Sequence, residues 1–554
     1  MSMDDKLNAA VEKHKQGNVS DAVSVYQEIL KSDPKHPDAL HYFGLAHMGT
    51  GQFEKAADLI RLSVTYNPDN AKAWSNLGSA LKNANRIGEA GDALQKACIL
   101  APDFCDAHYN LGVVLTAQAK LDEAEQHYKK ALEIVPNHID SLCNLGCLYQ
   151  IRDDMETAEA YFQEALAIDP TYPPALNNAG YVFYMTDDFQ AAKEAFDEVI
   201  KTSPNFAEAH YNRALIDEHY GHIDEALARH EHAISLNPNY AEPHFSMGYY
   251  QLLRGDFENG WKNYEWRLKR QSYIPQIYTA ETPRWQGQYL EADKSLLVYS
   301  EQGLGDSMQV VRFLEMVKSR APNVILMVQP ALMQLFAPNA KKHGIELVAN
   351  TEAIPKTDFQ IPMMSLPFAL NITESNLPAD MPYMEANAAK IKEWQAKLGT
   401  VKNKLKIGIT WRGSANKQLD KGRSFPLALY KIIREANPDI RIISLQKGPG
   451  EDEIDALEKD LSLEVYDLDP QRDFTDTAAL IKNLDLVIAC DSSIAHLAGN
   501  LDVPVWLVCK KRSEWRWMLN RQDSPWYPSM HIFRPTTNEW DGVFNEMATA
   551  IKSL

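Results

Sequence analysis

Three polar segments of the chain carry residue types that can bind and activate a substrate, and each directly follows a short apolar run. The first is 301–307, which contains Gly303, Gly305 and Asp306. The two glycines permit a tight turn, and a carboxylate at the start of the next helix either caps that helix or serves as a general base. The Gly-Lys-Ser/Thr ending of a P-loop is missing, so the segment is not a loop of that class.

The second segment, 411–424, is basic within an acidic protein. The residues of interest in it are Trp411, Arg412, Gly413, Ser414, Lys417, Lys421, Gly422, Arg423 and Ser424. Four cations in one loop suit a phosphate-bearing ligand, because guanidinium and ammonium groups pair with phosphate oxygens. The alternative is an ordinary solvated basic loop.

The third segment, 491–499, begins with Asp491 and places Ser492 and Ser493 at the predicted start of a helix, with His496 one turn later. The first N–H groups of a helix have no partner within it, and the helix dipole favours an anion there. We therefore expect this segment to contact a diphosphate, with His496 at the ligand. The alternative for a lone histidine is a structural role.

The apolar runs before these segments predict the strands that position them. The predicted strands are 295–300, 324–329 and 358–362 in a first part, and 406–411, 440–446, 463–468, 484–490 and 503–509 in a second part. Near-continuous apolar strands separated by helices predict parallel sheets covered on both faces. Because ligands bind at the carboxyl ends of such strands, we expect the three segments to face a cleft between two doubly wound, Rossmann-like sub-domains.

The N-terminal half follows a different rule, a proline every 34 residues: Pro34, Pro68, Pro102, Pro136, Pro170, Pro204 and Pro238. This is the period of the tetratricopeptide repeat (TPR), a helix–turn–helix unit. Small residues keep the same register, at Gly44, Gly78, Gly112, Gly146, Gly180, Ala214 and Gly248. They let the paired helices approach closely. We predict an α-solenoid of seven repeats and an atypical eighth from about 241, of the kind that caps or docks a solenoid.

A column of asparagines keeps the same register: Asn76, Asn110, Asn144, Asn178 and Asn212. On the first helix of each repeat this position faces the concave groove. A row of primary amides can pair with the donors and acceptors of an extended peptide without reading its side chains. The alternative is that each asparagine forms local hydrogen bonds.

Composition narrows the function classes. At 554 residues, with 45% hydrophobic and 24% charged residues, the chain is a folded protein of several domains. Its formal charge of −19 argues against nucleic acid or an anionic membrane as a main partner. The N-terminal residues lack the features of a signal peptide, no transmembrane stretch is expected, and six scattered cysteines fit a reducing compartment. We expect a cytoplasmic protein.

Two residue pairs have spacings that could suggest a metal ion, and we expect neither to hold one. Cys143 and Cys147 lie one helical turn apart, but nothing nearby completes a set of four ligands. Asp467 and Asp469 form an Asp-x-Asp pair that also fits the ordinary alternation at the end of a strand.

The C-terminal segments resemble the glycosyltransferase domain related to lipopolysaccharide heptosyltransferases. The segments that carry the resemblance are 301–306, 411–424, 444–448, 491–499, 515–517 and 523–528. With the repeat arm in front, the chain resembles TPR-containing bacterial protein glycosyltransferases of the flagellin-modifying type, and its asparagine column resembles that of O-GlcNAc transferases. The resemblance implies a GT-B fold, two doubly wound sub-domains, following the TPR superhelix.

The resemblance also implies a reaction: metal-independent, inverting transfer of a sugar from a nucleotide-sugar to a Ser or Thr hydroxyl, with Asp306 as base. It implies donor binding by Gly303, Gly305, Trp411, Arg412, Gly413, Lys417, Arg423, Gln446, Lys447, Asp491, Ser492, Ser493 and His496. Ser492-Ser493 replaces the Thr-Gly of the family, and Gln309 stands near a family histidine, so donor and acceptor contacts are expected to differ. No cofactor is expected, since the nucleotide-sugar is a substrate. Four aromatic residues could stack on the donor or pack in the core: Trp515, Trp517, Trp526 and Tyr527.

The expected domains are a TPR superhelix at 1–270, an ordered strap at 271–293, and GT-B sub-domains at 294–400 and 401–537. A final helix at 538–554 is expected to pack back on the first sub-domain. The expected partners are a nucleotide-sugar, a protein or peptide in the groove and, because TPR arms often mediate dimers, a second copy. Two alternatives stay open: a scaffold whose transferase-like domain is not catalytic, and a transferase for a glycan or lipid-linked acceptor.

Overall fold

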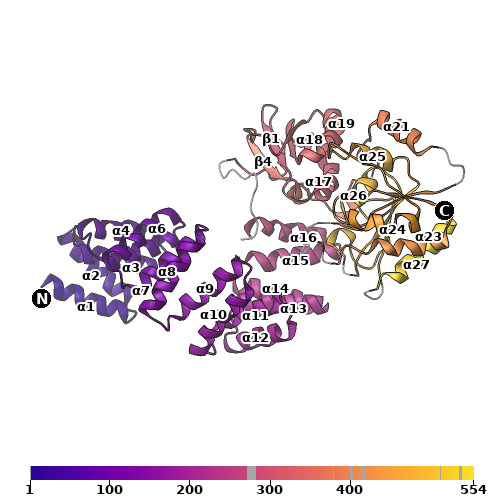
Figure 1. Cartoon of the computed structure of the whole chain (residues 1–554). Helices are drawn as coiled ribbons and strands as arrows, with labels where there is room; N and C mark the ends of the chain where they lie inside the picture. The colour runs from indigo at the N-terminus through magenta and orange to yellow at the C-terminus, as the bar shows by residue number, and fades with distance from the viewer. Residues whose placement is uncertain are drawn as a thin grey trace. The chain divides into compact units, whose positions relative to one another are not determined.

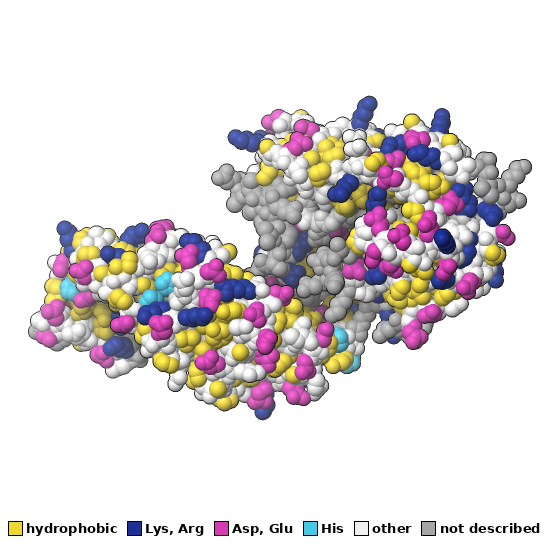
Figure 2. All heavy atoms as spheres, in the orientation of Figure 1, with side chains coloured by type: hydrophobic (Ala, Val, Ile, Leu, Met, Phe, Trp, Pro, Cys, Tyr) yellow, Lys and Arg dark blue, Asp and Glu magenta, His cyan; other side chains and the backbone are white. Residues whose placement is uncertain are grey.

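The computed structural model describes residues 2–270, 282–378, 380–399, 404–413, 420, 422–511, 513–535 and 539–554. The chain forms two compact units, Met1–Pro238 and Asn239–Leu554. In the space-filling view, acidic and basic side chains are interspersed over the visible face of the N-terminal helices (Figure 2).

The first unit is a run of paired antiparallel helices (Figure 1). They are α1 (Met3–Lys15), α2 (Val19–Ser32), α3 (Pro37–Gly49), α4 (Phe53–Tyr66), α5 (Ala71–Asn83), α6 (Ile87–Leu100), α7 (Cys105–Ala117), α8 (Leu121–Ile134), α9 (Ile139–Ile151), α10 (Met155–Ile168), α11 (Pro173–Met185), α12 (Phe189–Thr202), α13 (Ala207–Tyr220) and α14 (Ile223–Leu236). Each repeat proline follows the second helix of its pair, as the 34-residue register predicts. The predicted solenoid is confirmed.

The recurring glycine is required where the two helices of a pair touch. A Cβ at Gly112 would lie 2.5 Å from Cε1 of Tyr128, and one at Gly146 would lie 2.5 Å from Cε1 of Phe162. Both rings are buried and lie on the second helix of the same repeat. The missing side chain therefore makes room for a large residue sixteen positions later.

The eighth helix pair packs with the C-terminal unit. It comprises α15 (Ala241–Leu253), α16 (Phe257–Tyr264) and the 3₁₀ turn η1 (Glu265–Lys269). Trp261 and Tyr264 are buried beside Trp515 and Trp526, and Trp261 Nε1 donates to the carbonyl of Ile372 at 3.0 Å. The sequence placed a boundary near 270, but the compact unit begins at Asn239 because these aromatic rings complete its core.

Residues 271–281 of the expected strap lie outside the described part of the chain. In the part that follows, Trp285 is fully buried and its backbone N–H donates to the carbonyl of Gln360 at 2.9 Å. This contact attaches the segment to the edge of the first sheet.

The first sheet is parallel, with strand order β3-β2-β1-β4. Its strands are β1 (Ser295–Tyr299), β2 (Asn323–Val328), β3 (Glu346–Ala349) and β4 (Phe359–Pro362). The principal helices connecting them are α17 (Leu304–Val310), α18 (Leu314–Arg320) and α19 (Met333–His343). Strand β3 was not predicted, because it is a short edge strand whose apolar run extends only over Leu347–Ala349.

The second sheet is also parallel, with strand order β10-β9-β8-β5-β6-β7. Its strands are β5 (Lys406–Ile409), β6 (Arg441–Ser444), β7 (Leu463–Glu464), β8 (Leu486–Cys490), β9 (Val505–Val508) and β10 (Met530–Phe533). Its helices include α23 (Tyr430–Ala436), α24 (Ile454–Leu461), α25 (Thr475–Ile481) and α26 (Ser493–Asn500), and α21 (Ala388–Leu398) packs on α25. The predicted class, a solenoid followed by two parallel α/β sub-domains of the GT-B type, is confirmed.

The C-terminal helix does not pack where the sequence analysis placed it. Helix α27 (Asp541–Ala550) lies against α23, with Phe544 buried beside Phe425 and Tyr430. It therefore completes the second sub-domain rather than returning to the first. No helix in the described part of the chain combines the length and the apolar character needed to cross a membrane.

Candidate active site

The three polar segments predicted from the sequence meet within the C-terminal unit. Helices α17 and α26, which follow strands β1 and β8, lie side by side (Figure 1). A Cβ at Gly305 would lie 2.8 Å from Cδ2 of His496, which joins the first segment to the third. Arg423 Nη2 donates to the carbonyl of Asp491 at 2.8 Å, which joins the second segment to the third.

Asp306 lies in the first turn of α17, and both of its carboxylate oxygens have partners. Oδ2 accepts a hydrogen bond from the backbone N–H of Gly303 at 2.8 Å, and Oδ1 is ion-paired with Arg516. Its side chain keeps 23% of its surface exposed. Asp306 thus caps the helix and still faces solvent, so a substrate can reach it if one of these contacts is exchanged.

Arg516 is the partner that the sequence analysis did not assign to the site. Its buried guanidinium donates to Glu514 Oε1 and to Gln309 Oε1, each at 2.5 Å, besides its contact with Asp306. Burial alone would lower the pKa of Arg516, but the neighbouring Glu514 and Asp306 outweigh it and raise the pKa. The arginine is a fixed positive charge that orients Asp306.

His496 is a buried, neutral side chain. Its Nδ1 is hydrogen-bonded to the hydroxyl of Tyr527 at 2.8 Å. Burial lowers the pKa of His496 well below its usual range, and Arg516, Arg312 and Arg423 lower it further. The imidazole can take part in hydrogen bonds here but does not carry a positive charge at neutral pH.

The start of α26 has the features of an anion site. Ser492 is the N-cap residue, yet its side chain does not cap the helix, and its buried Oγ has only the weakly bonding thiol of Cys490 beside it among the described residues. Nε of Arg423 is buried and has no hydrogen-bond partner among the described residues, whereas its Nη2 pairs with Asp491. A buried polar atom without a strong partner is costly, so two at one helix start indicate a position for a ligand. The helix N–H groups and dipole favour an anion.

Lys510 adds a further cation near this anion site that the sequence analysis did not single out. Its stem lies near Gly422, with 3.5 Å between Lys510 Cδ and a Cβ built on that glycine. Burial lowers the pKa of Lys510; Asp491 raises it and Arg423 lowers it. It stands just after strand β9, at the start of the cationic run Lys510-Lys511-Arg512, which the sequence analysis did not consider.

Trp411 of the second segment and Gln446, which follows β6, make contacts within the second sub-domain. Trp411 is fully buried in the core of the second sub-domain. Gln446 Oε1 accepts from the N–H groups of Trp411 and Arg412 at 3.0 and 3.1 Å, and its Nε2 donates to the carbonyls of Arg412 and Pro449 at 3.1 and 2.8 Å. Gln446 therefore ties the loops after β5 and β6 together. The structure gives it a positioning role.

The remaining residues that were predicted to bind the nucleotide-sugar are of three kinds. Some are cations paired with carboxylates, one lies in a loop where its backbone N–H is bonded, and others lie outside the described residues. Arg412 Nε donates to Glu453 Oε1 at 2.8 Å, and Lys447 Nζ lies 3.3 Å from Asp467 Oδ1. The N–H of Gly413 donates to Ser424 Oγ at 3.0 Å, so this turn lies beside the anion site. Ser414, Lys417 and Lys421 lie outside the described residues.

The aromatic residues near the site belong to the core. Trp515, Trp517, Trp526 and Tyr527 are each at most 2% exposed. The rings of Trp515 and Trp261 meet edge to face, 5.2 Å apart. Of the two roles considered in the sequence analysis, core packing is therefore the one that the structure supports.

Two other candidates from the sequence have structural partners. Asp469 accepts hydrogen bonds from the backbone N–H groups of Asp476 and Thr477 at 2.6 and 3.3 Å, at the start of α25. Its carboxylate therefore caps the start of α25. Glu301 is paired with Arg267 Nη2 at 2.6 Å and accepts from the N–H of Met364 at 3.1 Å. It connects η1 to the loop after β1.

In the first unit, the asparagines of the column form local contacts. Asn76 Nδ2 is hydrogen-bonded to Nε2 of His41 at 2.8 Å, and Asn212 Nδ2 donates to Asn177 Oδ1 at 3.0 Å. Asn212 is buried, whereas the other four asparagines are half-buried. The remaining contacts are those of Asn110 with the carbonyl of Asp106, Asn144 with the hydroxyls of Tyr109 and Tyr128, and Asn178 with Sγ of Cys147.

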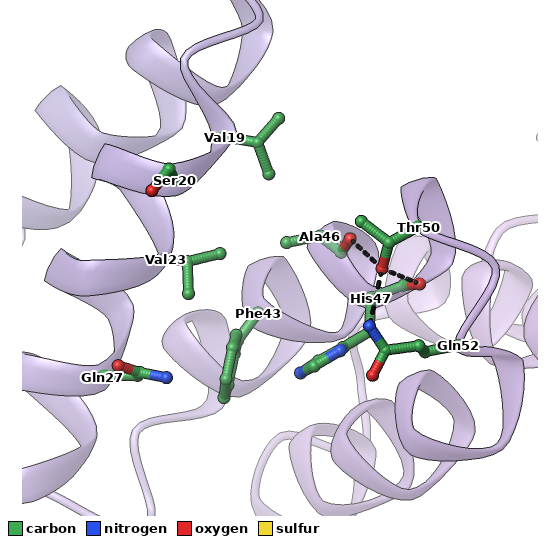
Figure 3. Close-up of a pocket in the computed structure, with 9 residues that line it drawn as sticks. All are labelled: Val19, Ser20, Val23, Gln27, Phe43, Ala46, His47, Thr50 and Gln52. Carbon is green, nitrogen blue, oxygen red and sulfur yellow. Dashed lines mark hydrogen bonds between the residues drawn. The ribbon is translucent and has the colours of Figure 1, made fainter.

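A separate pocket of ≈ 350 Å³ lies between α2 and α3 of the first unit (Figure 3). Val23, Phe43 and Ala46 lie around its centre, and Gln27 and His47 flank it. Its described lining residues include no carboxylate and no lysine or arginine. An apolar hollow with polar edges suits the side chain of a bound segment rather than a charged ligand.

Comparison with known proteins divides the chain in the same way. Residues 2–218 match the model of the cilia and flagella-associated protein 70 C-terminal domain, and residues 364–538 match glycosyltransferase family 9 (heptosyltransferase). Protein FlbA of Caulobacter vibrioides is 26% identical over 326 residues, which cover 55% of this chain and 54% of that protein. The chain thus spans about half the length of this curated relative.

Solved structures similar to the chain include the APC/C hetero-tetramer Cut9–Hcn1, with a TM-score of 0.38 and 19% identity over 48% of this chain and 52% of that one. MamA matches with a TM-score of 0.28 and 29% identity, over 29% of this chain and 94% of that one. Together with the family models, the fold shows a TPR-type N-terminal region and a C-terminal glycosyltransferase family 9 domain. This confirms the two-part resemblance seen in the sequence.

Proposed function

For a chain that joins a TPR-type arm to a glycosyltransferase family 9 domain, we propose transfer of a sugar from a nucleotide-sugar to a Ser or Thr hydroxyl of a protein acceptor. The observation that carries the proposal is the pairing of two helix starts. A partly exposed carboxylate, Asp306, lies at the start of α17, and the anion site of Ser492 and Arg423 lies at the start of the adjacent α26.

The anion site binds the diphosphate of the donor. Ser492 Oγ and Arg423 Nε each gain a strong hydrogen-bond partner, and the start of α26 adds backbone N–H donors. As the bond between the anomeric carbon and the phosphate oxygen breaks, negative charge grows on that oxygen. Preorganised donors and a fixed guanidinium stabilise this charge without a metal ion.

Asp306 is the general base for the incoming hydroxyl. The hydroxyl proton moves to Asp306 while its oxygen forms a bond to the anomeric carbon from the side opposite the leaving phosphate, which inverts that carbon. Arg516, which is ion-paired with the carboxylate, fixes its orientation. The protonated Asp306 then returns its proton to solvent.

The acceptor is a protein segment bound by the N-terminal helices. Half-buried Asn110 and Asn144 and the apolar pocket beside Phe43 offer amide and side-chain contacts to an extended chain. Asn212 is buried and bonded to Asn177, so we give it a structural role. Flagellin is the acceptor class suggested by the sequence resemblance.

Donor binding tests the proposal directly. The full chain is melted with UDP-, GDP-, ADP- and CMP-sugars, and one class is expected to raise the melting temperature because it binds only the folded protein. Arg423→Gln is expected to weaken that donor at least about 10-fold, the lower range for one charge-assisted contact. The control, Lys431→Gln, removes an exposed lysine paired with Asp460. A flat response to all four classes would instead favour a scaffold without catalysis.

A further inference from the structure

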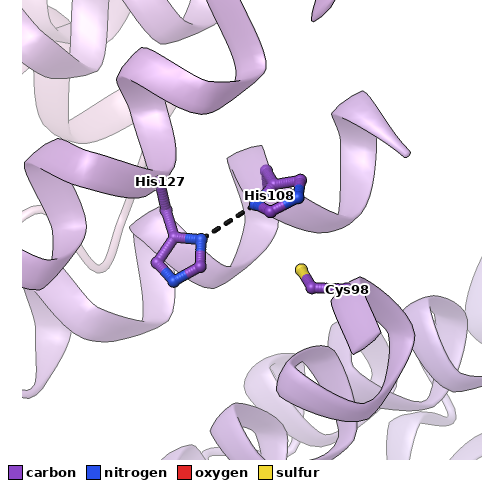
Figure 4. Close-up of side chains that lie close together, drawn as sticks. All are labelled: Cys98, His108 and His127. Atoms are coloured by element: carbon purple, nitrogen blue, oxygen red, sulfur yellow. Dashed lines mark hydrogen bonds between the residues drawn. The ribbon is translucent and has the colours of Figure 1, made fainter. Parts of the chain in front are cut away.

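The N-terminal unit contains a cluster of metal-binding side chains far along the chain from the transferase site. Cys98 on α6, His108 on α7 and His127 on α8 place Sγ and one ring nitrogen each within 4.8 Å of one another. Figure 4 shows the sulfur of Cys98 directed toward the rings. The three side chains come from three helices of two adjacent repeats.

The hydrogen bonds of His108 prepare one of its nitrogens for a metal ion. Its Nε2 lies 3.0 Å from the carbonyl of Pro102, which can only accept, so Nε2 carries the proton. Nδ1 therefore presents its lone pair, and it lies 2.9 Å from Nδ1 of His127. A histidine ligand whose other nitrogen donates to a backbone carbonyl is the usual arrangement in metal sites.

The cluster is not a general feature of the repeat. The residues in register with Cys98 are all aliphatic: Leu30, Val64, Leu132, Leu166, Ile200 and Ile234. His210 is in register with His108 and also bonds to its repeat proline, with Nε2 2.8 Å from the carbonyl of Pro204. Near His210, however, the positions in register with Cys98 and His127 are occupied by Ile200 and Arg229. The proline contact explains one histidine in each case, but it does not explain Cys98 or His127.

Cys98 packs in the hydrophobic core of the first unit, a role that the aliphatic residues of the other repeats fill without a thiol. It is 7% exposed, and its Sγ has no hydrogen-bond partner among the described residues. Sγ of Cys105, by contrast, lies 3.5 Å from the carbonyl of Ala131. Burial raises the pKa of Cys98 to about 11, so its proton remains unless a cation replaces it.

We propose that Cys98, His108 and His127 bind a transition-metal ion of the Zn²⁺ class. One thiolate and two imidazoles suit such an ion and do not suit Mg²⁺ or Ca²⁺, which take oxygen ligands. On binding, the thiol proton leaves to solvent and His127 carries its proton on Nε2, so that sulfur and two Nδ1 atoms form the bonds. The fourth position is filled by water or by an external donor.

The geometry needs only small movements. An ion bound to one sulfur and two nitrogens at about 2.0–2.3 Å holds those atoms about 3.3–3.8 Å apart. The present atoms already lie within 4.8 Å, with the two nitrogens 2.9 Å apart. A bound ion would link helix α6 of one repeat to α7 and α8 of the next and make the solenoid more rigid between these two repeats.

Cobalt substitution tests the site in the full, untagged chain after treatment with a chelator and a reductant. One Co²⁺ per chain is expected to give a thiolate-to-metal charge-transfer absorption and the strong visible bands of tetrahedral Co²⁺. Zn²⁺ is expected to displace the cobalt and to raise the melting temperature of the N-terminal unit. Cys98→Val, which installs an aliphatic residue as in the other repeats, is expected to abolish the charge-transfer band.

The controls separate this site from its neighbours. His127→Gln is expected to weaken binding at least about 100-fold, on the scale of losing a metal-site contact. His210→Gln, which removes the other proline-bonded histidine, and Cys105→Ala, which alters the nearby Cys105–His138 cluster, are expected to retain full binding. The proposal is wrong if the wild-type chain shows no stoichiometric charge-transfer band, or if Cys98→Val binds cobalt like the wild type.

Discussion

At the scale of single residues, the ion pair between Asp306 and Arg516 determines how the proposed base is held. Arg516 is almost fully buried and is shared by Asp306, Glu514 and Gln309. A buried guanidinium between two carboxylates makes each of them depend on it, because an unpaired charge in the interior is costly. The same contact fixes the orientation of Asp306.

Arg516→Met is therefore expected to destabilise the C-terminal unit by about 3–5 kcal/mol, the cost of leaving a buried charge without its partner. Urea unfolding followed by tryptophan fluorescence measures this, since all but one of the 11 tryptophans lie beyond residue 238. Adding Glu514→Gln removes the stranded charge and is expected to recover part of the loss. Equal stability of Arg516→Met and wild type would show that the ion pair contributes nothing.

His496 gives the unit a pH dependence whose sign follows from its lowered pKa. The folded protein keeps His496 neutral, whereas the unfolded chain takes up a proton near the usual value of about 6.5. The contribution of His496 to the free energy of unfolding is fully present above that pH. It is lost as the pH falls below it, by up to about 1.4 kcal/mol per pH unit.

The melting temperature of the C-terminal unit is therefore expected to fall more steeply from pH 7.5 to 5.5 in wild type than in His496→Gln. His531→Gln, at a half-buried histidine elsewhere in the unit, is the control and is expected to keep the wild-type slope. If His496→Gln and wild type have the same slope, His496 is not the residue that titrates.

At the scale of helices and strands, the sequence predicted most of what positions the site. Strong periodic signals, the 34-residue proline register and the apolar runs before Glu301, Arg412 and Asp491, correspond to real helix pairs and real strands. Short edge strands such as β3 and β10 were missed because their apolar runs, Leu347–Ala349 and Ile532–Phe533, are too short to stand out. The final helix was assigned to the wrong sub-domain, because the sequence does not show against which sheet the apolar face of α27 that carries Phe544 will pack.

The chemistry of the site was less predictable than its framework. Asp306, Arg423 and Ser492 were candidates because they stand at strand ends, which sequence can locate. Arg516 reaches the site from a loop distant in the chain, so only the fold brings it there, whereas Lys510 stands just after strand β9 and was overlooked. Gln446 and Trp411 also lie at strand ends. Gln446, however, forms hydrogen bonds that tie two loops together, and Trp411 is buried in the core.

The repeat glycines give a prediction for the helix pairs. Gly112→Ala places a Cβ 2.5 Å from the buried ring of Tyr128 and is expected to cost about 1–3 kcal/mol, as overpacking does. Gly88→Ala in α6, with nothing within 4 Å of its Cβ, is expected to stabilise the helix by about 0.5–1 kcal/mol. Thermal unfolding of the first unit, followed by circular dichroism, compares them. Equal effects of the two substitutions on stability would show that Tyr128 does not need the space left by Gly112.

At the scale of the whole molecule, the division after Pro238 decides how the arm can be removed. Residues 241–264 carry Trp261 and Tyr264 into the aromatic core beside Trp515. A deletion that extends to residue 270 removes part of the transferase core, whereas one that ends at Pro238 leaves it complete.

Removal of 1–238 is thus expected to preserve donor binding and to abolish transfer to a protein acceptor, because the acceptor contacts are lost. Removal of 1–270 is expected to lower the melting temperature of the remaining unit by several degrees, through the loss of the buried rings of Phe257, Trp261 and Tyr264. Undiminished protein modification by the 239–554 chain would instead support a glycan or other acceptor that the arm does not hold.

The most direct measurement of the central claim is sugar transfer to the protein acceptor by Asp306→Asn, with donor binding measured on the same preparation. Asparagine keeps the size of the side chain but cannot accept the hydroxyl proton, so turnover is expected to fall by about 10²–10⁴-fold while donor affinity is retained. Asp293→Asn is the control and is expected to behave as wild type, because this exposed carboxylate lies before strand β1, whereas Asp306 follows it. Wild-type turnover in Asp306→Asn would contradict the account.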